Sequence, residues 1–446
     1  MTGSNLECGF INDVLFCYDS RNSTLYSLSM HQSRSLSDLD QQWQLSDTPN
    51  ESRIYSNMIP LADADSLMLY GGIGLENQEL MNQTKIYHVD SGKWKKMSNY
   101  VNPRSNMNRQ IMMASAAYVP KLGAVVFYGG QEITPMAASN QSNTRGFDLI
   151  TLYNLGTNIW SLFSSQANIY SATSYPVSQT ATFFPSKGSI VYLGGALASN
   201  EAILGLIPLS YGMMFNTNNG VWTNRTFGGK TPSPRISYSA TLLPNGDQIL
   251  IYGGSSRVND SLSVVVSDFC YTLNLSSMNW TEHTELYSTN SLAPRSNHSA
   301  VLIETTIFIL FGLGSDNQDA SHMLAIDVQD PTMLAFIDHY TSNKSKLSTG
   351  AIVGIVIGCV VALAILIVLM AIFYMKRRRS KKKEGELDMQ ISRFKEDKIE
   401  VERSSTRPPS YSRMSVIANE EDYALAASAT NSAFTLQQNK ETNTHL

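Results

Sequence analysis

Residues 249–254 read ILIYGG and residues 125–130 read VVFYGG. Each is a short apolar run, rich in β-branched and aromatic residues, that ends in two glycines. Runs of this kind predict strands, and a glycine pair allows the main chain to bend sharply. The pattern returns at Leu67–Gly72 and Ile190–Gly195, and in weaker form at Ile307–Gly312. Because its first glycine recurs at steps of 58, 65, 59 and 59 residues, the pattern is a repeat.

Two further landmarks accompany the glycine pairs. An aromatic or apolar residue precedes a tryptophan by seven positions at Tyr87 and Trp94, Tyr153 and Trp160, Phe215 and Trp222, and Leu273 and Trp280. Arginines lie 17 or 18 residues before the first glycine at Arg53, Arg235 and Arg295, and Arg104 does so more loosely. We expect these arginines either to line a central channel and bind an anion, or to donate hydrogen bonds to main-chain carbonyls between units.

A fixed period of this length indicates a repeat architecture, and four strands per period are typical of a propeller blade. We therefore predict an all-β fold in which residues 1–340 form about six four-stranded blades. The combination of apolar run, glycine pair and spaced tryptophan resembles the kelch repeat. The first unit, at Val14–Ser20, lacks the glycine pair and the last lacks the tryptophan. Seven blades are therefore an alternative.

The resemblance leaves both a binding domain and an enzyme open, because galactose oxidase also has a kelch-type propeller. A copper site of that kind would need a tyrosine cross-linked to a cysteine, a second tyrosine and two histidines. Six histidines precede residue 349, but they fall in different units without the spacing of metal ligands. We predict no catalytic residues, no metal and no cofactor. A membrane-tethered propeller resembling a copper radical oxidase is the alternative.

Binding partners are expected at the loops, since loops at the rim of a repeat array bind ligands. The longest predicted insertions are residues 131–147 and 29–42. Residues 1–349 carry 19 basic and 26 acidic residues, a net charge of −7. We expect a protein or a glycan on the propeller and no nucleic acid.

Residues 350–374 read GAIVGIVIGCVVALAILIVLMAIFY and carry no charge. A helix of this length would reach about 37 Å, enough to cross a bilayer, and we predict a transmembrane helix after a linker at residues 341–349. Seven of the eight residues 376–383 are basic, which predicts a cytosolic C-terminus and an extracytoplasmic propeller. Residues 375–383 form a stop-transfer collar that attracts anionic lipid.

The chain thus resembles fungal single-pass surface proteins with a kelch domain. A cytosolic kelch scaffold anchored by the helix is the alternative topology. The sequons favour the first arrangement, because all ten precede the predicted span and suggest the plasma membrane or the secretory pathway. They begin at Asn22, Asn50, Asn82, Asn140, Asn224, Asn259, Asn274, Asn279, Asn297 and Asn343. Residues 1–8 do not form a signal peptide, and we expect the natural chain to begin upstream of Met1.

Cys8 and Cys17 are predicted to form a disulfide. A two-residue turn at Asn12-Asp13 would place the two cysteines opposite each other in a hairpin, close enough to bond in an oxidising compartment. Two unlinked small core residues are the alternative.

The C-terminal tail, residues 384–446, is predicted to be mostly disordered, because beyond Ser404 it is rich in Ser, Thr and Asn. Pro408, Pro409 and Tyr411 form a Pro-Pro-x-Tyr motif, the ligand of WW domains. We therefore expect a WW-domain protein, such as a ubiquitin ligase, as a cytosolic partner.

Within the predicted span, Gly350, Gly354 and Gly358 share one helical face. Small residues at this spacing let two helices approach closely, which predicts a homodimer through the membrane helix. Glycine is also common in membrane helices that do not pair.

Overall fold

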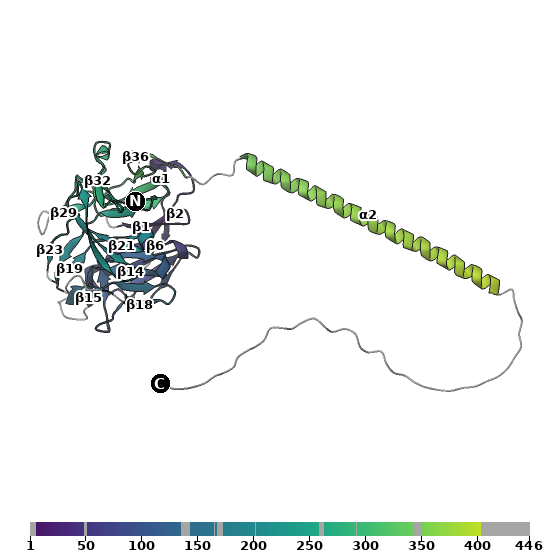
Figure 1. The fold of residues 1–446 in the computed structure, drawn as a ribbon, viewed down its shortest axis with the longest axis horizontal. Coiled ribbons are helices and arrows are strands. Elements are labelled where there is room, and N and C mark those ends of the chain that lie inside the picture. Colours follow the sequence, from purple (N-terminus) through teal and green to yellow (C-terminus); the bar gives the residue numbers. More distant parts are fainter. Residues whose placement is uncertain are drawn as a thin grey trace, which may run out of the picture. The chain divides into compact units, whose positions relative to one another are not determined.

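The computed structural model describes most of the chain, and the structural statements below concern the described residues. These are residues 6–48, 51–134, 143–164, 166, 173–200, 202–257, 263–290, 292–342 and 349–402. The chain divides into two compact units, Met1–Ser345 and Lys346–Leu446 (Figure 1).

Six sheets of the first unit share the same antiparallel order, in which neighbouring strands follow one another in the chain. The first three are β1 (Leu6–Ile11), β2 (Val14–Asp19), β3 (Thr24–Ser29) and β5 (Gln44–Asp47); β6 (Arg53–Leu61), β7 (Ser66–Gly74), β8 (Thr84–His88) and β9 (Lys93–Lys96); and β13 (Ser115–Val119), β14 (Ala124–Tyr128), β17 (Thr151–Asn154) and β18 (Ile159–Leu162). The other three are β20 (Thr180–Phe184), β21 (Ser189–Leu193), β24 (Tyr211–Asn216) and β25 (Trp222–Thr226); β27 (Ser239–Leu242), β28 (Gln248–Tyr252), β31 (Cys270–Asn274) and β32 (Asn279–Glu282); and β33 (Ser299–Ile303), β34 (Thr306–Leu310), β35 (Leu324–Asp327) and β36 (Ala335–Ile337). β26 (Gly228–Gly229) adds a parallel fifth strand beside β32.

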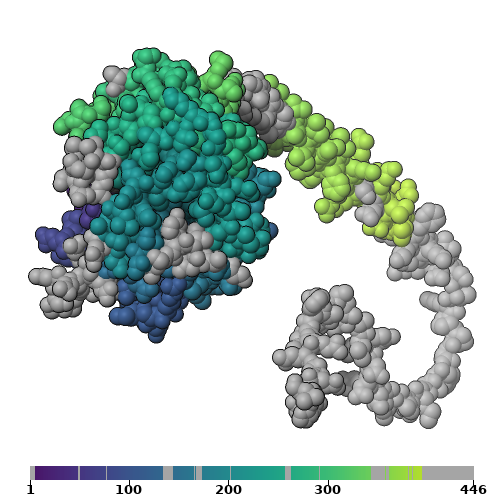
Figure 2. Space-filling model, turned by 60° about the vertical axis from the view of Figure 1, so that its left-hand side comes forward, coloured from purple at the N-terminus to yellow at the C-terminus, as the bar shows by residue number. Residues whose placement is uncertain are grey.

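The first strands of these sheets lie around a common axis. β1 contacts β6, and the contacts continue in order through β13, β20, β27 and β33, which in turn contacts β1. The sheets therefore close into a ring, as the ribbon shows for the first unit (Figure 1). In the space-filling view the described part of this unit forms a continuous surface whose colours pass from blue through teal to green (Figure 2). This is the expected all-β propeller.

The apolar runs of the repeat form the second strand of each sheet. Every residue of β7, β14, β21 and β34 is buried. Each of these strands has a neighbouring sheet on both faces, so its side chains do not alternate between core and solvent. The glycine pair was expected at the end of the innermost strand. That expectation is wrong, because the pair lies on the second strand and the innermost strand precedes it.

The glycine pair is a bend rather than a strand end. Gly129 and Gly130 have φ values of 68° and 86°, and a Cβ on Gly130 would lie 2.5 Å from the carbonyl oxygen of Met112 and 2.6 Å from the amide nitrogen of Ala114. Only glycine accepts both this backbone conformation and this close approach. Beyond the bend the first and second strands pair again.

These renewed pairings make short ladders at one rim of the propeller. They are β12 (Gln110–Met112), β15 (Gln131–Thr134) and β16 (Asn143–Gly146); β19 (Tyr175–Val177), β22 (Ala196–Ala198) and β23 (Ile203–Leu206); and β29 (Ser255–Arg257) with β30 (Ser263–Val265). The hairpin of β10 (Val101–Asn102) and β11 (Met107–Asn108) and the 3-10 turn Leu75–Asn77 lie in other loops of this rim. Further 3-10 turns are Ala62–Ala64, Pro120–Leu122, Pro185–Lys187 and Thr284–Leu286.

The repeat tryptophans join neighbouring sheets. Each lies opposite its spaced partner across the third and fourth strands, as Phe215 lies opposite Trp222. Trp222 also contacts Tyr128 of the preceding sheet, with ring centroids 4.8 Å apart. Trp280 donates a hydrogen bond of 2.8 Å from Nε1 to the carbonyl oxygen of Leu209. The seven-residue spacing thus reflects a cross-strand pair that packs against the next blade.

The ring closes between the first and last sheets without exchange of strands. β4 (Arg34–Ser35) pairs with β37 (His339–Tyr340), and the helix α1 (Leu36–Asp40) buries Leu39 in a core shared with the last sheet. The carboxylate of Asp40 accepts a hydrogen bond from the amide of Met323. We call residues 30–43 the seam segment. The predicted ligand loop at residues 29–42 therefore contributes to closing the ring.

Cys8 and Cys17 lie opposite each other in β1 and β2, and their sulfurs are bonded. The Asn12-Asp13 turn that places them so has φ values of 50° and 61°. Both values are left-handed, as a two-residue hairpin turn requires. Among the described cysteines Cys270 is free and buried.

The second unit contains the helix α2 (Thr349–Glu402). Over the residues that can be described, no helix has both the length and the apolarity needed to cross a membrane. The predicted span includes residues 350–356 and 358–360, whose side chains lie outside the described set, and Gly350, Gly354 and Gly358 are among them. Pro408, Pro409 and Tyr411 lie outside it as well. The predicted tail differs in its first part, which is helical to Glu402 because its residues are mainly good helix formers.

Candidate binding site at the channel mouth

The two faces of the propeller carry different loops. First and third strands run in one direction and second and fourth strands in the other, so loops after second and fourth strands share a face. This face carries the rim ladders, and we call it the rim face. The opposite face, the turn face, has shorter connections such as residues 12–13, 120–123 and 185–188. The rim face therefore offers most of the variable loop surface of the ring.

A left-handed residue interrupts or precedes the first strand of five sheets at the level of the bend. These residues are Tyr55, Met113, Ser178, Ser237 and Asn297, with φ between 51° and 60°. Their backbones are linked from one sheet to another, since Met113 N donates to Tyr55 O, Ser178 N to Met113 O, and Asn297 N to Ser237 O. Left-handed residues other than glycine cost about 1–2 kcal/mol each. The repeated conformation is thus held by hydrogen bonds between blades.

A cavity of about 390 Å³ lies inside this ring of left-handed residues. Four sheets contribute its walls, and the walls carry hydrogen-bonding side chains but no charged group. The polar lining includes Ser56, Asn57, Ser115, Ser178, Gln179, Thr180, Ser237 and Asn297. Two lining tyrosines are occupied, because Tyr70 donates to the carbonyl oxygen of Ala114 and Tyr238 to that of Leu193. The buried Gln179 Oε1 has no hydrogen-bonding partner in the described structure.

A second cavity of about 290 Å³ adjoins the same strands and contains Glu7. Glu7 Oε1 accepts a hydrogen bond of 2.9 Å from Ser56 Oγ, whereas the enclosed Oε2 has no partner among the described residues. Burial raises the pKa of Glu7 to about 8, although Ser56 and Arg53 oppose the shift. His298 lines the same cavity, and burial, together with Arg295, lowers its pKa to about 3. The site therefore contains a neutral imidazole and an easily neutralised carboxyl group.

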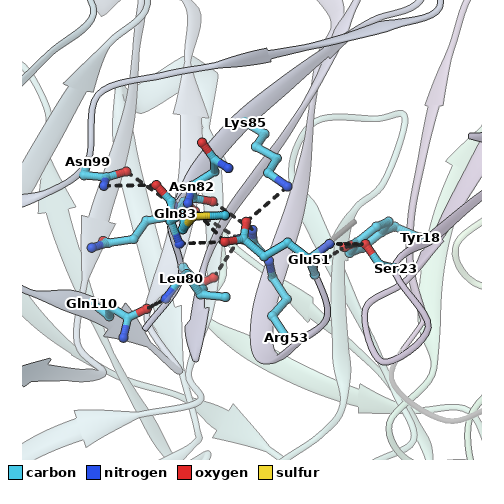
Figure 3. Close-up of polar contacts among 12 residues, drawn as sticks. Tyr18, Ser23, Glu51, Arg53, Leu80, Asn82, Gln83, Lys85, Asn99 and Gln110 are labelled. Atoms are coloured by element: carbon cyan, nitrogen blue, oxygen red, sulfur yellow. Dashed lines mark hydrogen bonds and ion pairs between the residues drawn. The ribbon is translucent and has the colours of Figure 1, made fainter. Parts of the chain in front are cut away.

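Arg53 lies fully buried at one of the positions singled out in the sequence. It donates to the carbonyl oxygens of Gly71, Asn82 and Gln83 and to Glu51, 3.0 Å away. Figure 3 shows the Glu51 carboxylate between Lys85, Arg53 and the loop at Asn82. Burial opposes ionisation of Glu51, but Lys85 and Arg53 lower its pKa overall. The arginine therefore fixes the rim loop to the blade and does not line the channel.

The other repeat arginines act in the same way. Arg235 donates to the carbonyl oxygens of Gly253 and Asp268 and pairs with the Asp268 carboxylate at 2.7 Å. Arg295 donates to the carbonyl oxygen of Phe311. The carbonyl alternative is thus correct, but the bonds connect strands and loops of the same sheet rather than different units.

Arg104 differs from these three arginines. Its side chain is 41% exposed and pairs with Asp148 at 3.3 Å. Ile111 takes the position of the repeat arginine in that sheet, because its carbonyl oxygen meets Gly71 as that of Arg295 meets Gly253. No sequence signal marks this substitution, since the linker before β13 is longer.

A further buried cluster in the third sheet was not predicted. Glu132 accepts hydrogen bonds from Tyr100 and Asn102 at 2.8 and 2.6 Å, and lies 3.6 Å from Arg109. Burial raises the pKa of Glu132 despite these donors. The partners come from residues about 30 positions apart, so no local motif marks the cluster. It connects the rim hairpin to the predicted insertion at residues 131–147, of which residues 135–142 lie outside the described structure.

The predicted sequons occupy several environments. Asn22, Asn224 and Asn279 are exposed, whereas Asn82, Asn274 and Asn297 are half-buried. Asn297 lines both central cavities, which makes it a poor acceptor for a glycan. Asn50, Asn140, Asn259 and Asn343 lie outside the described residues.

The described part of the chain contains no group of three His, Cys, Asp or Glu side chains that could hold a metal ion. Cys8 and Cys17 are bonded to each other, and burial raises the pKa of the Cys270 thiol. The structure therefore supplies no observation that favours the copper-oxidase alternative.

Comparison with known proteins supports the fold. Residues 178–357 match a family model described as the KLHDC2/KLHL20/DRC7 Kelch-repeats domain. A solved structure, described as "Structure of YjhT", is similar with a TM-score of 0.56 and 11% identity, covering 76% of this chain and 98% of that chain. No curated protein matches the chain. At this identity the structural likeness shows the fold alone, and with the family match it identifies a kelch-repeat domain on a propeller.

Proposed function

We propose that this kelch-repeat propeller is a recognition module that binds a protein partner at its channel mouth. The observation that carries the proposal is the cavity of about 390 Å³ on the propeller axis, which four sheets wall with uncharged hydrogen-bonding groups. Peptide groups and short polar side chains are complementary to such walls, and pockets of this size with a few fixed polar groups are typical ligand sites. A kelch domain is generally a protein-binding scaffold, which agrees with this use of the site.

Two substitutions with the same change of side chain test this proposal. Ser237→Arg would place a long charged side chain at the channel mouth, and Ser277→Arg would place one on an exposed turn of the turn face. Purified full-length protein is applied to cells that display the partner. We expect Ser237→Arg to reduce bound protein at least about tenfold and Ser277→Arg to leave it unchanged.

Loss of binding in both variants, or in neither, would contradict a site at the channel mouth. Prior treatment of the cells distinguishes the class of partner. Protease treatment should abolish binding, whereas a loss that follows only glycosidase treatment would indicate the glycan alternative.

We further propose that the chain is anchored in a membrane through residues 350–374, with the propeller outside and the tail in the cytosol. The uncharged 25-residue stretch, the basic collar and the sequons support this arrangement. Endoglycosidase treatment of the protein from its native cells should then lower its mass. An unchanged mass would favour the cytosolic scaffold.

The tail would bind a WW-domain protein through Pro408, Pro409 and Tyr411, and through it a ubiquitin ligase. Tyr411→Ala removes the aromatic side chain that such domains require. We expect this variant to remain longer at the cell surface than the unchanged protein. An equal lifetime would argue against this route.

A further inference from the structure

We propose that the cavity beside Glu7 receives a lysine side chain of the partner, whose ammonium group pairs with the Glu7 carboxylate. This inference rests on the proposed function, because it specifies the chemistry of a residue that the partner inserts at the channel mouth.

The first argument is the hydrogen bonding of Glu7. Ser56 Oγ satisfies Oε1, but Oε2 is enclosed without a partner in the described structure. Buried polar atoms nearly always have a partner, and an unsatisfied one costs about 1–3 kcal/mol. Rotation about the terminal torsion of a glutamate is soft, so either oxygen can be presented to the cavity. A cation that enters the cavity would remove this cost.

The second argument is the composition of the cavity wall. Leu6 and Ile54 supply apolar surface, which suits the four methylenes of a lysine. The amides of Asn57 and Asn297 supply further acceptors on the same wall. An ammonium group carries three donors and no acceptor, so a carboxylate and amide oxygens match it.

The third argument concerns the charges that face Glu7. Arg53 on β6 is committed to Glu51 and to main-chain carbonyls, and Arg295 before β33 donates to main-chain oxygens. Arg21, which follows β2, lines the cavity but lies 3.9 Å from Asp19, which offsets its charge.

The remaining titratable groups near Glu7 are neutral at physiological pH. Burial lowers the pKa of His298 to about 3 and raises the pKa values of Tyr18 and Tyr70. The carboxyl group of Glu7 is therefore the one acidic charge available on this cavity wall among the described residues.

Long-range charge also favours a basic partner. Asp316 and Asp319 are exposed on a loop that is bonded to the residue next to Asn297, through the 2.8 Å hydrogen bond from Leu313 N to Ser296 O. Residues 1–349 carry a net charge of −7. Such a field raises the local concentration of cationic ligands.

The test uses full-length protein and the probe Nα-acetyl-lysine N-methylamide. The norleucine analogue has a similar apolar stem without the charge. Binding is measured by ligand-observed NMR. We expect the lysine probe to bind at least about tenfold more tightly than the norleucine probe, which corresponds to about 1.4 kcal/mol.

Three variants identify the site. Glu7→Gln should remove the preference for lysine, while Asp90→Asn, which removes a carboxylate from an exposed turn of the turn face, should retain it. Arg21→Gln should strengthen binding of the lysine probe, because it removes a repelling charge from the cavity wall. This opposite change distinguishes an effect on the site from a loss of folding.

The pH dependence gives an independent reading. The ammonium group of the probe stays charged to about pH 10, whereas Glu7 ionises near pH 8. Affinity for the lysine probe should therefore rise between pH 6 and 9, with release of a proton at pH 7.

Affinity that falls over this range would mean that the protonated carboxyl group donates to a neutral ligand, and would overturn the proposal. Equal binding by Glu7→Gln would also overturn it. If Ser237→Arg still abolishes binding of the partner in that case, the proposed function stands without this inference.

Discussion

The indole nitrogen of Trp160 donates a hydrogen bond of 2.9 Å to the carbonyl oxygen of Ser98, across the boundary between the second and third sheets. Trp94 holds the same place one sheet earlier, but its indole nitrogen is buried without an acceptor among the described residues. The two tryptophans thus have similar packing and different hydrogen bonding.

Replacement of each tryptophan by phenylalanine separates these contributions. Trp160→Phe leaves the Ser98 oxygen without its donor, and we expect it to lower the free energy of unfolding by about 1–3 kcal/mol. Trp94→Phe should cost less, because it removes an unsatisfied donor along with the lost ring surface. Urea unfolding measures both. An equal cost for the two would mean that packing alone holds the blades together.

A second prediction concerns the bend. Gly130→Ala would bring a methyl group to 2.6 Å from Ala114 N at a φ of 86°. We expect a loss of about 3 kcal/mol or more, since both strain and overlap must be relieved. Gly123 is the matched control, because its φ is 55° and no atom lies within 4 Å of the position that a Cβ would take. Gly123→Ala should cost about 1 kcal/mol; similar melting temperatures for the two variants would refute the close-approach argument.

The buried arginines provide a third prediction. Arg53→Ala leaves Glu51 and several carbonyl oxygens without their donor, and breaking such a buried pair costs about 3–5 kcal/mol. Arg104→Ala removes a partly exposed arginine and should change stability by less than about 1 kcal/mol. Chemical denaturation of both variants tests whether the repeat position, rather than the charge, carries the stability. A small effect of Arg53→Ala would show that water replaces the guanidinium.

Glu7 makes stability depend on pH in a direction that can be measured. Its pKa is raised from 4.5 to about 8 in the folded protein, so the folded state retains a proton that the unfolded state has lost. Stability should therefore fall as pH rises from 4.5 towards 8, by up to about 1.4 kcal/mol per pH unit.

The interval from pH 6.5 to 8 isolates this effect. The lowered pKa of His298 affects stability only below about pH 6.5, where its contribution rises with pH and opposes that of Glu7. Glu7→Gln should flatten the profile between pH 6.5 and 8, and Asp90→Asn should leave it as in the unchanged protein. A profile that Glu7→Gln does not alter would mean that Glu7 is hydrated and ordinary.

The disulfide gives a fifth prediction. Cys8 and Cys17 close a loop with a sequence separation of 9, for which loss of chain entropy in the unfolded state predicts a stabilisation of about 2–3 kcal/mol. Replacement of both cysteines by alanine should lower the melting temperature, and a reductant should lower it only when both are present. Cys270→Ala should leave the response to reductant intact. A reductant that has no effect on the unchanged protein would contradict the bond.

Features set by near neighbours were predictable from the sequence. The sum of positions about the Asn12-Asp13 turn places Cys8 opposite Cys17, and the seven-residue spacing places Phe215 opposite Trp222. Both follow from the two-residue period of a strand and the reach of a tight turn. The return of apolar runs and glycine pairs likewise determined the propeller, because each run must be buried by the next copy of itself.

The environment of each polar side chain was decided only in the tertiary structure. Glu7 meets Ser56 from 49 positions away, and the amide of Cys8 donates to Ser299 from 291 positions away. The position of the repeat arginine in the third sheet is taken by Ile111, and the seam segment joins the last sheet although it reads as a loop. Burial and hydrogen bonding depend on which blades become neighbours, and a local pattern contains no information about the opposite side of a ring.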